Sequence, residues 1–183
     1  MPGGGGDGVM PFTRTQAGVA AGMAAGFAVT VAAFAWPSLP VVPAGAEQRL
    51  ALWLAASVSV SVWLLIGIAL LARHRFFSPT DIDGGGLTEG TPAARLLQSL
   101  IQNTLEQAVL AIPAYGAWLW LAPEGRRGLV IVCAGLFGLG RLLFFLGYRF
   151  GAPARALGFT LTFYPTVGLY LFLLPRVLAM LVG

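Results

Sequence analysis

Long apolar stretches, separated by short polar segments, run along almost the whole chain. A helix needs about 20 mostly apolar residues to cross roughly 30 Å of hydrocarbon, because each residue advances about 1.5 Å. Five windows meet this requirement, at residues 16–36, 50–72, 92–121, 128–150 and 156–182. The pattern therefore predicts an all-α integral membrane helix bundle, in which the chain crosses the bilayer five times.

The first window has two interpretations. It is either a retained transmembrane helix over residues 14–37 or a signal peptide, since Ala-Gly-Ala at 44–46 resembles a cleavage site. Its apolar stretch is longer than the roughly 7–15 residues of an ordinary signal peptide, which favours the retained helix. The glycine-rich residues 1–13 before it are expected to form a disordered tail.

Composition supports the membrane assignment. The 183 residues are 57% hydrophobic and only 10% charged, whereas a soluble domain carries about 25% charged residues. A soluble globular enzyme is therefore excluded. The net charge of +4 comes from arginines scattered between apolar runs, without a basic stripe, so no nucleic-acid partner is expected. Cys133 is the single cysteine, which excludes an intrachain disulfide.

The arginines predict the orientation. With five crossings, the ten arginines outside the middle of a predicted span divide six to four between the two sides of the membrane. The larger set is Arg14, Arg73, Arg75, Arg95, Arg149 and Arg155, and the smaller is Arg49, Arg126, Arg127 and Arg176. Because basic residues concentrate in cytosolic segments, we expect the N-terminus and the 73–95 loop of this multi-pass protein to be cytosolic.

The segment that follows residue 77 is rich in helix-breaking residues and predicts a loop. Asp81 and Asp83 resemble the start of a calcium-binding loop, but the twelfth position is Pro92 rather than a glutamate, so no metal site is expected. Thr91 followed by Pro92 is typical of a helix N-cap and first helical position.

Polar side chains recur every three or four residues in the third window, which places them on one helix face. They are Arg95, Gln98, Ser99, Gln102, Asn103 and Glu106. An isolated charge at the bilayer centre costs at least about 2.5–3.5 kcal/mol, so this face is expected to look into the bundle or a wet cavity.

A second intramembrane charge, Arg141, lies on the fourth predicted helix. Glu106 is roughly 16 Å and Arg141 roughly 12 Å from the cytosolic end of its helix. We therefore predict a Glu106–Arg141 ion pair, within a subunit or across an interface. Two interpretations stay open: structural contact between helices, or a polar pocket open to the cytosol.

Arg155 and Tyr148 fall in the same half of the membrane as this pair. A cationic side chain there would lower the pKa of a thiol or hold an anionic headgroup. The alternative is that Arg155 anchors the end of its helix at the membrane surface.

The order and spacing of these residues resemble the MAPEG family, the membrane-associated proteins in eicosanoid and glutathione metabolism. The motifs are Asn103-Thr-Leu-Glu106, Arg141-Leu-Leu-Phe-Phe-Leu-Gly147-Tyr148 and, seven residues later, Arg155. The resemblance implies the family's four-helix bundle over residues 50–182, with a cytosolic loop at 73–94 and one extra N-terminal helix.

By this resemblance the protein is a homotrimer that binds glutathione in clefts between subunits. Asn103, Glu106, Arg141 and Tyr148 would hold the tripeptide, and Arg155 would stabilise its thiolate. Three positions depart from the catalytic pattern. Ser99 replaces an arginine, Gln107 a tyrosine and Phe144 another tyrosine, so Ser99 and Gln107 are candidate binding residues of altered chemistry.

Two functions remain open at this point. One is glutathione-dependent conjugation, or peroxide reduction, of a lipophilic ligand that enters from the bilayer. The other follows from a similarity to the mattrin-like branch of the family, in the run from Gly151 through Arg155 and Gly158 to Pro165. That similarity implies a non-catalytic protein that binds lipid or takes part in membrane-protein scaffolding and turnover. A transporter is less favoured, because the helices show no inverted repeat.

Overall fold

The computed structural model describes residues 13–42, 44–85, 87 and 89–182, so the predicted tail falls almost entirely outside the described residues. Within them the chain is helical and contains no strand. The long helices are α1 (Arg14–Ala35), α2 (Ala46–Phe76), α3 (Pro92–Leu121), α4 (Leu129–Gly147) and α5 (Ala152–Val182). Short 3-10 turns, η1 (Glu124–Arg126) and η2 (Tyr148–Phe150), flank α4. The predicted all-α fold is confirmed.

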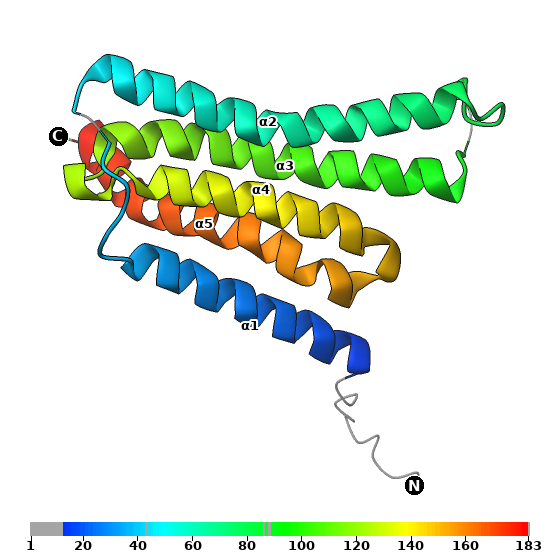
Figure 1. Ribbon diagram of the computed structural model, residues 1–183, viewed down its shortest axis with the longest axis horizontal. Coiled ribbons are helices and arrows are strands. Elements are labelled where there is room, and N and C mark those ends of the chain that lie inside the picture. Colours follow the sequence, from blue (N-terminus) through cyan, green and yellow to red (C-terminus); the bar gives the residue numbers. More distant parts are fainter. Residues whose placement is uncertain (1–12, 43, 86, 88, 183) are drawn as a thin grey trace, which may run out of the picture.

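Four helical segments are long and apolar enough to cross a membrane. These are α1, α2, the segment Glu124–Phe150 that contains α4, and α5. The third predicted crossing, α3, is not among them because polar side chains interrupt its apolar surface. It nevertheless has 30 residues and packs along α2, with its long axis roughly parallel to the other bundle helices (Figure 1).

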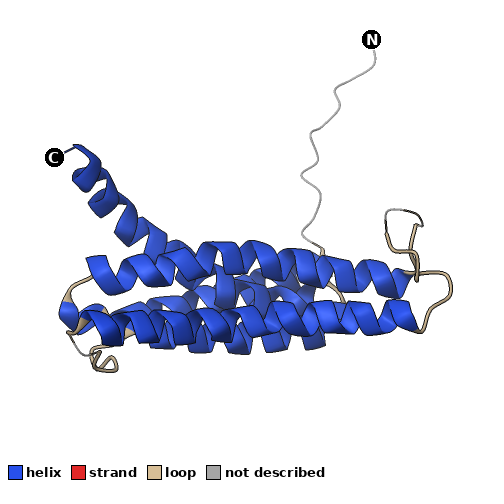
Figure 2. Ribbon diagram, turned by 90° about the horizontal axis from the view of Figure 1, so that it is seen from above, coloured by secondary structure: helices blue, strands red, loops and turns tan. Residues whose placement is uncertain are grey.

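The helices run alternately in opposite directions, and α1 lies on the outside of the bundle, against α5 (Figure 1). The N-terminus of α1, the α2–α3 loop and the α4–α5 turn therefore meet at one end of the molecule. This end carries the larger arginine set, as the sequence predicts. Its cytosolic location stays a prediction. At the other end, the last turns of α5, which contains Pro165 and Pro175, project away from the bundle (Figure 2).

Helix starts follow local capping chemistry. Thr13 and Gln16 form a reciprocal capping box, so α1 begins at Arg14, at the start of the helix expected over 14–37 and two residues before its apolar window. Thr91 caps α3 by accepting a hydrogen bond from the Ala94 amide at 3.3 Å, and Pro92 occupies the first turn. The predicted start of the third helix is confirmed.

Small residues let α5 approach both of its neighbours closely. On the α1 side, a Cβ at Gly22 would lie 2.8 Å from Ala156 Cβ, and the Thr160 hydroxyl donates a hydrogen bond to the Gly22 carbonyl at 3.3 Å. On the α4 side, a Cβ at Gly158 would lie 2.7 Å from the Gly140 carbonyl oxygen. The helix backbones therefore meet where larger side chains do not fit.

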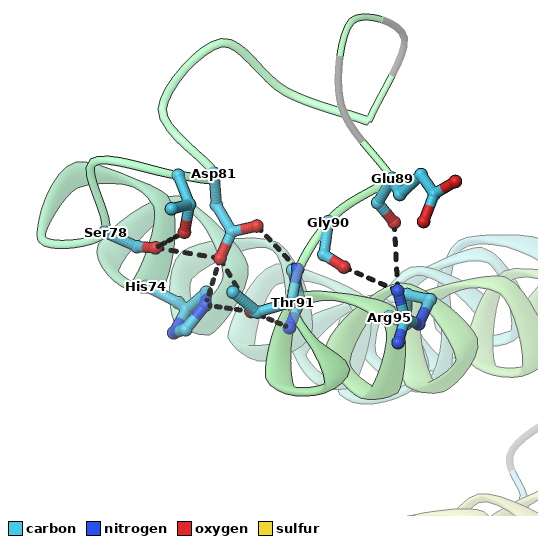
Figure 3. Close-up of polar contacts among 9 residues, drawn as sticks. His74, Ser78, Asp81, Glu89, Gly90, Thr91 and Arg95 are labelled. Carbon is cyan, nitrogen blue, oxygen red and sulfur yellow. Dashed lines mark hydrogen bonds and ion pairs between the residues drawn. The ribbon is translucent and has the colours of Figure 1, made fainter.

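Asp81 organises the loop between α2 and α3 (Figure 3). It is 1% exposed and accepts hydrogen bonds from the Thr91 amide at 2.8 Å, the Thr91 hydroxyl at 2.7 Å and the Ser78 hydroxyl at 2.9 Å. His74 Nε2 lies 2.8 Å from the same carboxylate. These four residues, the Asp81 cluster, join the end of α2 to the start of α3.

The Asp81 cluster predicts a pH-dependent loop. Hydrogen bonds, chiefly those from Thr91, hold the pKa of Asp81 well below its ordinary value of 3.8. A carboxyl group with a lowered folded-state pKa stabilises the fold fully above its unfolded-state pKa, and this contribution disappears as pH falls through the folded-state pKa. We expect the hydrogen-exchange protection of residues 78–85 to be constant above about pH 4 and to fall in more acidic solution.

The Asp81→Asn variant is expected to lose protection in this loop at neutral pH and to show no further acid-dependent loss attributable to this position. Asp83→Asn is the matched control, because Asp83 is exposed in the same loop. Exchange rates corrected for intrinsic pH dependence give the comparison. Equal protection in the wild type and Asp81→Asn would contradict the role of the cluster.

Candidate functional site

Arg141 is the buried centre of the polar contacts between α3, α4 and α5. Its side chain is fully inaccessible, at 0% exposure. One terminal nitrogen donates to Asn103 Oδ1 at 2.9 Å and lies 3.5 Å from the Thr104 hydroxyl, and the other donates to the Thr162 hydroxyl at 2.7 Å. The guanidinium also lies 4.5 Å from the centre of the Phe144 ring. Neutral acceptors and an aromatic ring thus surround this cation.

The predicted Glu106–Arg141 ion pair is wrong within the chain, because the described residues contain no such contact. Glu106 is exposed on α3 and accepts a hydrogen bond from the Gln102 amide at 2.8 Å. Similar depth in the membrane does not bring two side chains together when they point in different directions around their helices. Asn103, one turn earlier on α3, is the residue that reaches Arg141.

Glu106 instead lines a polar groove of about 550 Å³ between α2 and α3. Its polar lining residues are Arg75, Gln98, Ser99, Gln102, Asn103 and Glu106. The sequence predicts that the polar face of α3 looks into the bundle or a wet cavity. In the isolated subunit this face lines the groove and not the interior of the bundle. The interior positions of α3 are occupied by other residues, among them Leu100, Thr104 and Ala108.

Arg75 also lines the groove, although in the sequence it contributes only to the predicted orientation in the membrane. It is half-buried in the last turn of α2, beside the polar face of α3. Arg95, in contrast, turns away from the groove. Its guanidinium donates to the carbonyl oxygens of Glu89 at 3.2 Å and Gly90 at 2.6 Å, at the start of α3 (Figure 3). Arg75, rather than Arg95, supplies the cation near Ser99.

A second pocket, of about 440 Å³, lies beside the groove and is walled by α1, α4 and α5. Five aromatic side chains line it: Phe144, Tyr148, Phe159, Phe163 and Tyr164. Its polar lining includes Asn103 and Arg155. The Arg155 guanidinium lies 4.2 Å from the centre of the Tyr148 ring, which holds it over one wall of this aromatic pocket.

The predicted site residues therefore divide between two neighbouring pockets. Ser99 and Glu106 lie in the polar groove, Tyr148 and Arg155 lie in the aromatic pocket, and Asn103 lines both. Arg141 lines neither, but it fixes the amide of Asn103 by hydrogen bonding. Gln107 is buried in the bundle at 4% exposure and lines neither pocket.

This arrangement combines two kinds of chemistry at one end of a membrane bundle. The groove offers a cation, a carboxylate and amide groups to a charged ligand. The aromatic pocket offers mainly apolar surface, together with the half-buried guanidinium of Arg155. Such a pair of sites suits a polar ligand next to an apolar one, with Asn103 between them.

The fold is that of an integral membrane helix bundle, with two neighbouring pockets at one end. The model of the MAPEG family matches residues 50–174, which is more than half of the chain, and the protein belongs to the MAPEG family. The match begins in α2, so α1 lies outside it. No curated protein and no solved structure matches the chain.

Proposed function

We propose that this protein binds glutathione in the polar groove and a lipophilic ligand in the aromatic pocket. The observation that carries the proposal is the position of Asn103, which lines both pockets and so brings the two ligands next to one another. Family membership supports a MAPEG-like membrane protein, and the location of both pockets at the end with more arginines agrees with entry of glutathione from the cytosol.

The groove has chemistry complementary to glutathione. The tripeptide carries two carboxylates and an ammonium group, which need cationic and anionic partners respectively. Arg75 provides a guanidinium for a carboxylate, and Glu106 provides a carboxylate for the ammonium. Gln98, Gln102 and Asn103 present amides to the peptide bonds. Arg75 thus takes the role that the arginine missing at Ser99 has in catalytic members of the family.

Arg155 gives the site its proposed reactivity. A guanidinium beside a thiol favours the thiolate and lowers the thiol pKa. The thiolate then attacks an electrophilic carbon of the lipophilic ligand, so that a C–S bond forms while the thiol proton has already left to solvent. The leaving group departs with its electron pair, or, for an addition, the product takes up a proton from water.

The exposed groove also supports assembly with further copies of the chain, as a homotrimer. Glu106 and Gln102 are exposed on the isolated subunit, although Glu106 lies well inside α3. A charged side chain facing hydrocarbon is costly, so a neighbouring subunit that covers the groove would lower the free energy. The groove would then be a cleft between subunits.

A non-catalytic function is the alternative, and the aromatic pocket favours it. Phe144 stands where catalytic members have a tyrosine, and it packs edge-on against Tyr148 with ring centres 5.3 Å apart. A pocket lined mainly by rings, with one arginine, would hold a lipid without chemistry. In this mattrin-like function the protein binds lipid or scaffolds another membrane protein.

Calorimetric titration with glutathione in detergent tests the proposal. We expect saturable binding by the wild type and binding weakened about tenfold or more in Arg75→Ala, because the charge-assisted hydrogen bond to a glutathione carboxylate is lost. Arg149→Ala is the matched control, since Arg149 is an exposed arginine nearby that lines neither pocket. If the wild type gives no measurable heat of binding at millimolar glutathione, the proposal is overturned.

Turnover separates the two functions. Glutathione-dependent conjugation of a chlorodinitrobenzene electrophile, measured by absorbance, is expected for the wild type and the Arg149→Ala control and lost in Arg155→Ala. Binding of glutathione without conjugation of any tested electrophile would support the non-catalytic alternative.

A further inference from the structure

Helix α1 contributes a wall to the aromatic pocket. Val19 and Met23, four residues apart and so on one helix face, both line it. The family match begins at residue 50, so these two residues are an addition to the part of the chain that defines the family. Without α1, the surface of α5 that carries Arg155 and Phe159 would be open on this side.

The packing of α1 makes this wall close and well defined. Gly18 and Gly22 directly precede Val19 and Met23, and a Cβ at either glycine would lie 2.9 Å or less from a side-chain carbon of α5. The partners are Pro153 for Gly18 and Ala156 for Gly22. Close approach of the two backbones therefore brings the neighbouring side chains, Val19 and Met23, to the edge of the pocket.

One turn further along, Phe27 continues the same face. Its ring packs edge-on against Tyr164, with ring centres 6.2 Å apart, and Tyr164 is itself a pocket residue. Phe27 thus supports a pocket residue, Tyr164, without lining the pocket itself. Met23 lines the pocket but remains 44% exposed, so it lies at the rim of the pocket.

We propose that α1 determines which lipophilic ligands the aromatic pocket accepts, and that Met23 is the specificity-determining residue at its rim. This inference rests on the proposed function, because it assigns the aromatic pocket to the lipophilic ligand. The occupant beside Met23 is the unbranched apolar chain of that ligand, since aliphatic and aromatic side chains surround this part. A methionine side chain is flexible and adapts to such a chain.

Photolabelling in phosphatidylcholine nanodiscs tests the inference. The probe is a dodecyl alcohol with a diazirine in its chain, and unlabelled dodecanol is the competitor. Cleavage after arginine yields one peptide of α1, residues 15–49, and one of α5, residues 156–176. We expect competitor-sensitive labelling of both peptides in the wild type.

Two variants of Met23 are expected to change access to the pocket, one by narrowing the entrance and the other by widening it. Met23→Trp fills the entrance, and we expect competitor-sensitive labelling to fall about tenfold, as overpacking of an apolar site predicts. Met23→Ala widens it, and we expect a branched competitor to displace the probe better than it does from the wild type. Ala24→Trp is the matched control, because it adds the same side chain one residue away, outside the pocket lining.

The outcomes separate this inference from the proposed function. The heat of glutathione binding, measured by calorimetric titration, is expected to be unchanged in the Met23 variants. Normal glutathione binding together with unaltered photolabelling in both Met23 variants would overturn the role of α1 and leave the proposed function standing. Labelling in the wild type that dodecanol does not reduce would also overturn it. Loss of labelling in Ala24→Trp equal to that in Met23→Trp would mean that α1 is only a packing element.

Discussion

Replacement of Arg141 by alanine is expected to lower the free energy of unfolding by about 3 kcal/mol or more. The change removes a large, fully buried side chain and leaves a cavity between α3, α4 and α5. It also removes the donors to Asn103 and Thr162, so the acceptor of Asn103 loses its partner. Reversible unfolding in mixed micelles, followed by circular dichroism, measures the loss.

Two further variants sharpen this prediction. Arg141→Met restores most of the volume without a buried charge, and we expect it to recover more than half of the lost stability. Arg149→Ala, an exposed arginine of the same segment, is expected to stay within about 0.5 kcal/mol of the wild type. Wild-type stability of Arg141→Ala would show that the contacts of Arg141 do not hold the three helices together.

The Gly158→Val variant is expected to cost about 3 kcal/mol, close to the upper end for overpacked sites. The nearest atoms to an added Cβ are the Phe144 amide nitrogen, the Gly140 carbonyl oxygen at 2.7 Å and the Phe144 Cα at 2.9 Å. All three belong to the α4 backbone, which cannot turn aside as a flexible side chain does. The helices α4 and α5 must therefore separate, which also displaces Arg155 relative to Tyr148.

Gly135 provides the matched control for Gly158. An added Cβ there meets no atom within 4 Å, although Gly135 also lies in a membrane-spanning helix. We expect Gly135→Ala to be neutral or to stabilise by up to about 1 kcal/mol, through helix propensity. Unfolding of both variants in the same micelles gives the comparison, and equal stability of Gly158→Val and the wild type would contradict close backbone packing.

The helices were predictable from sequence because their signals are local. The lengths of the apolar stretches predicted the long helices, and the Thr91-Pro92 pair predicted where α3 begins. Among the residues that line the two pockets, Asn103, Tyr148 and Arg155 belong to the motifs that carry the family resemblance. The division of these residues between a groove and an aromatic pocket was not predictable, since it depends on how α3 is rotated relative to α2 and α4.

The case of Glu106 shows this limit most clearly. Its depth along α3 was estimated from the rise per residue, but hydrogen bonding to Arg141 requires the side chain to point at α4. Asn103 points there, whereas Glu106 points into the groove. Arg75 was missed for the complementary reason, because nothing in its local sequence shows that the last turn of α2 packs beside Ser99.

By itself, the sequence determined that this protein is an all-α membrane protein and that its arginines gather at one end, and it supplied candidate site residues. These properties follow from apolar length, charge and motif, which need no knowledge of neighbouring helices. Only the tertiary structure decided that Arg141 bonds to Asn103, that Arg95 turns to the loop and that Met23 borders the aromatic pocket. Such contacts depend on helix rotation and close packing between segments distant in the chain, which helix periodicity alone does not specify.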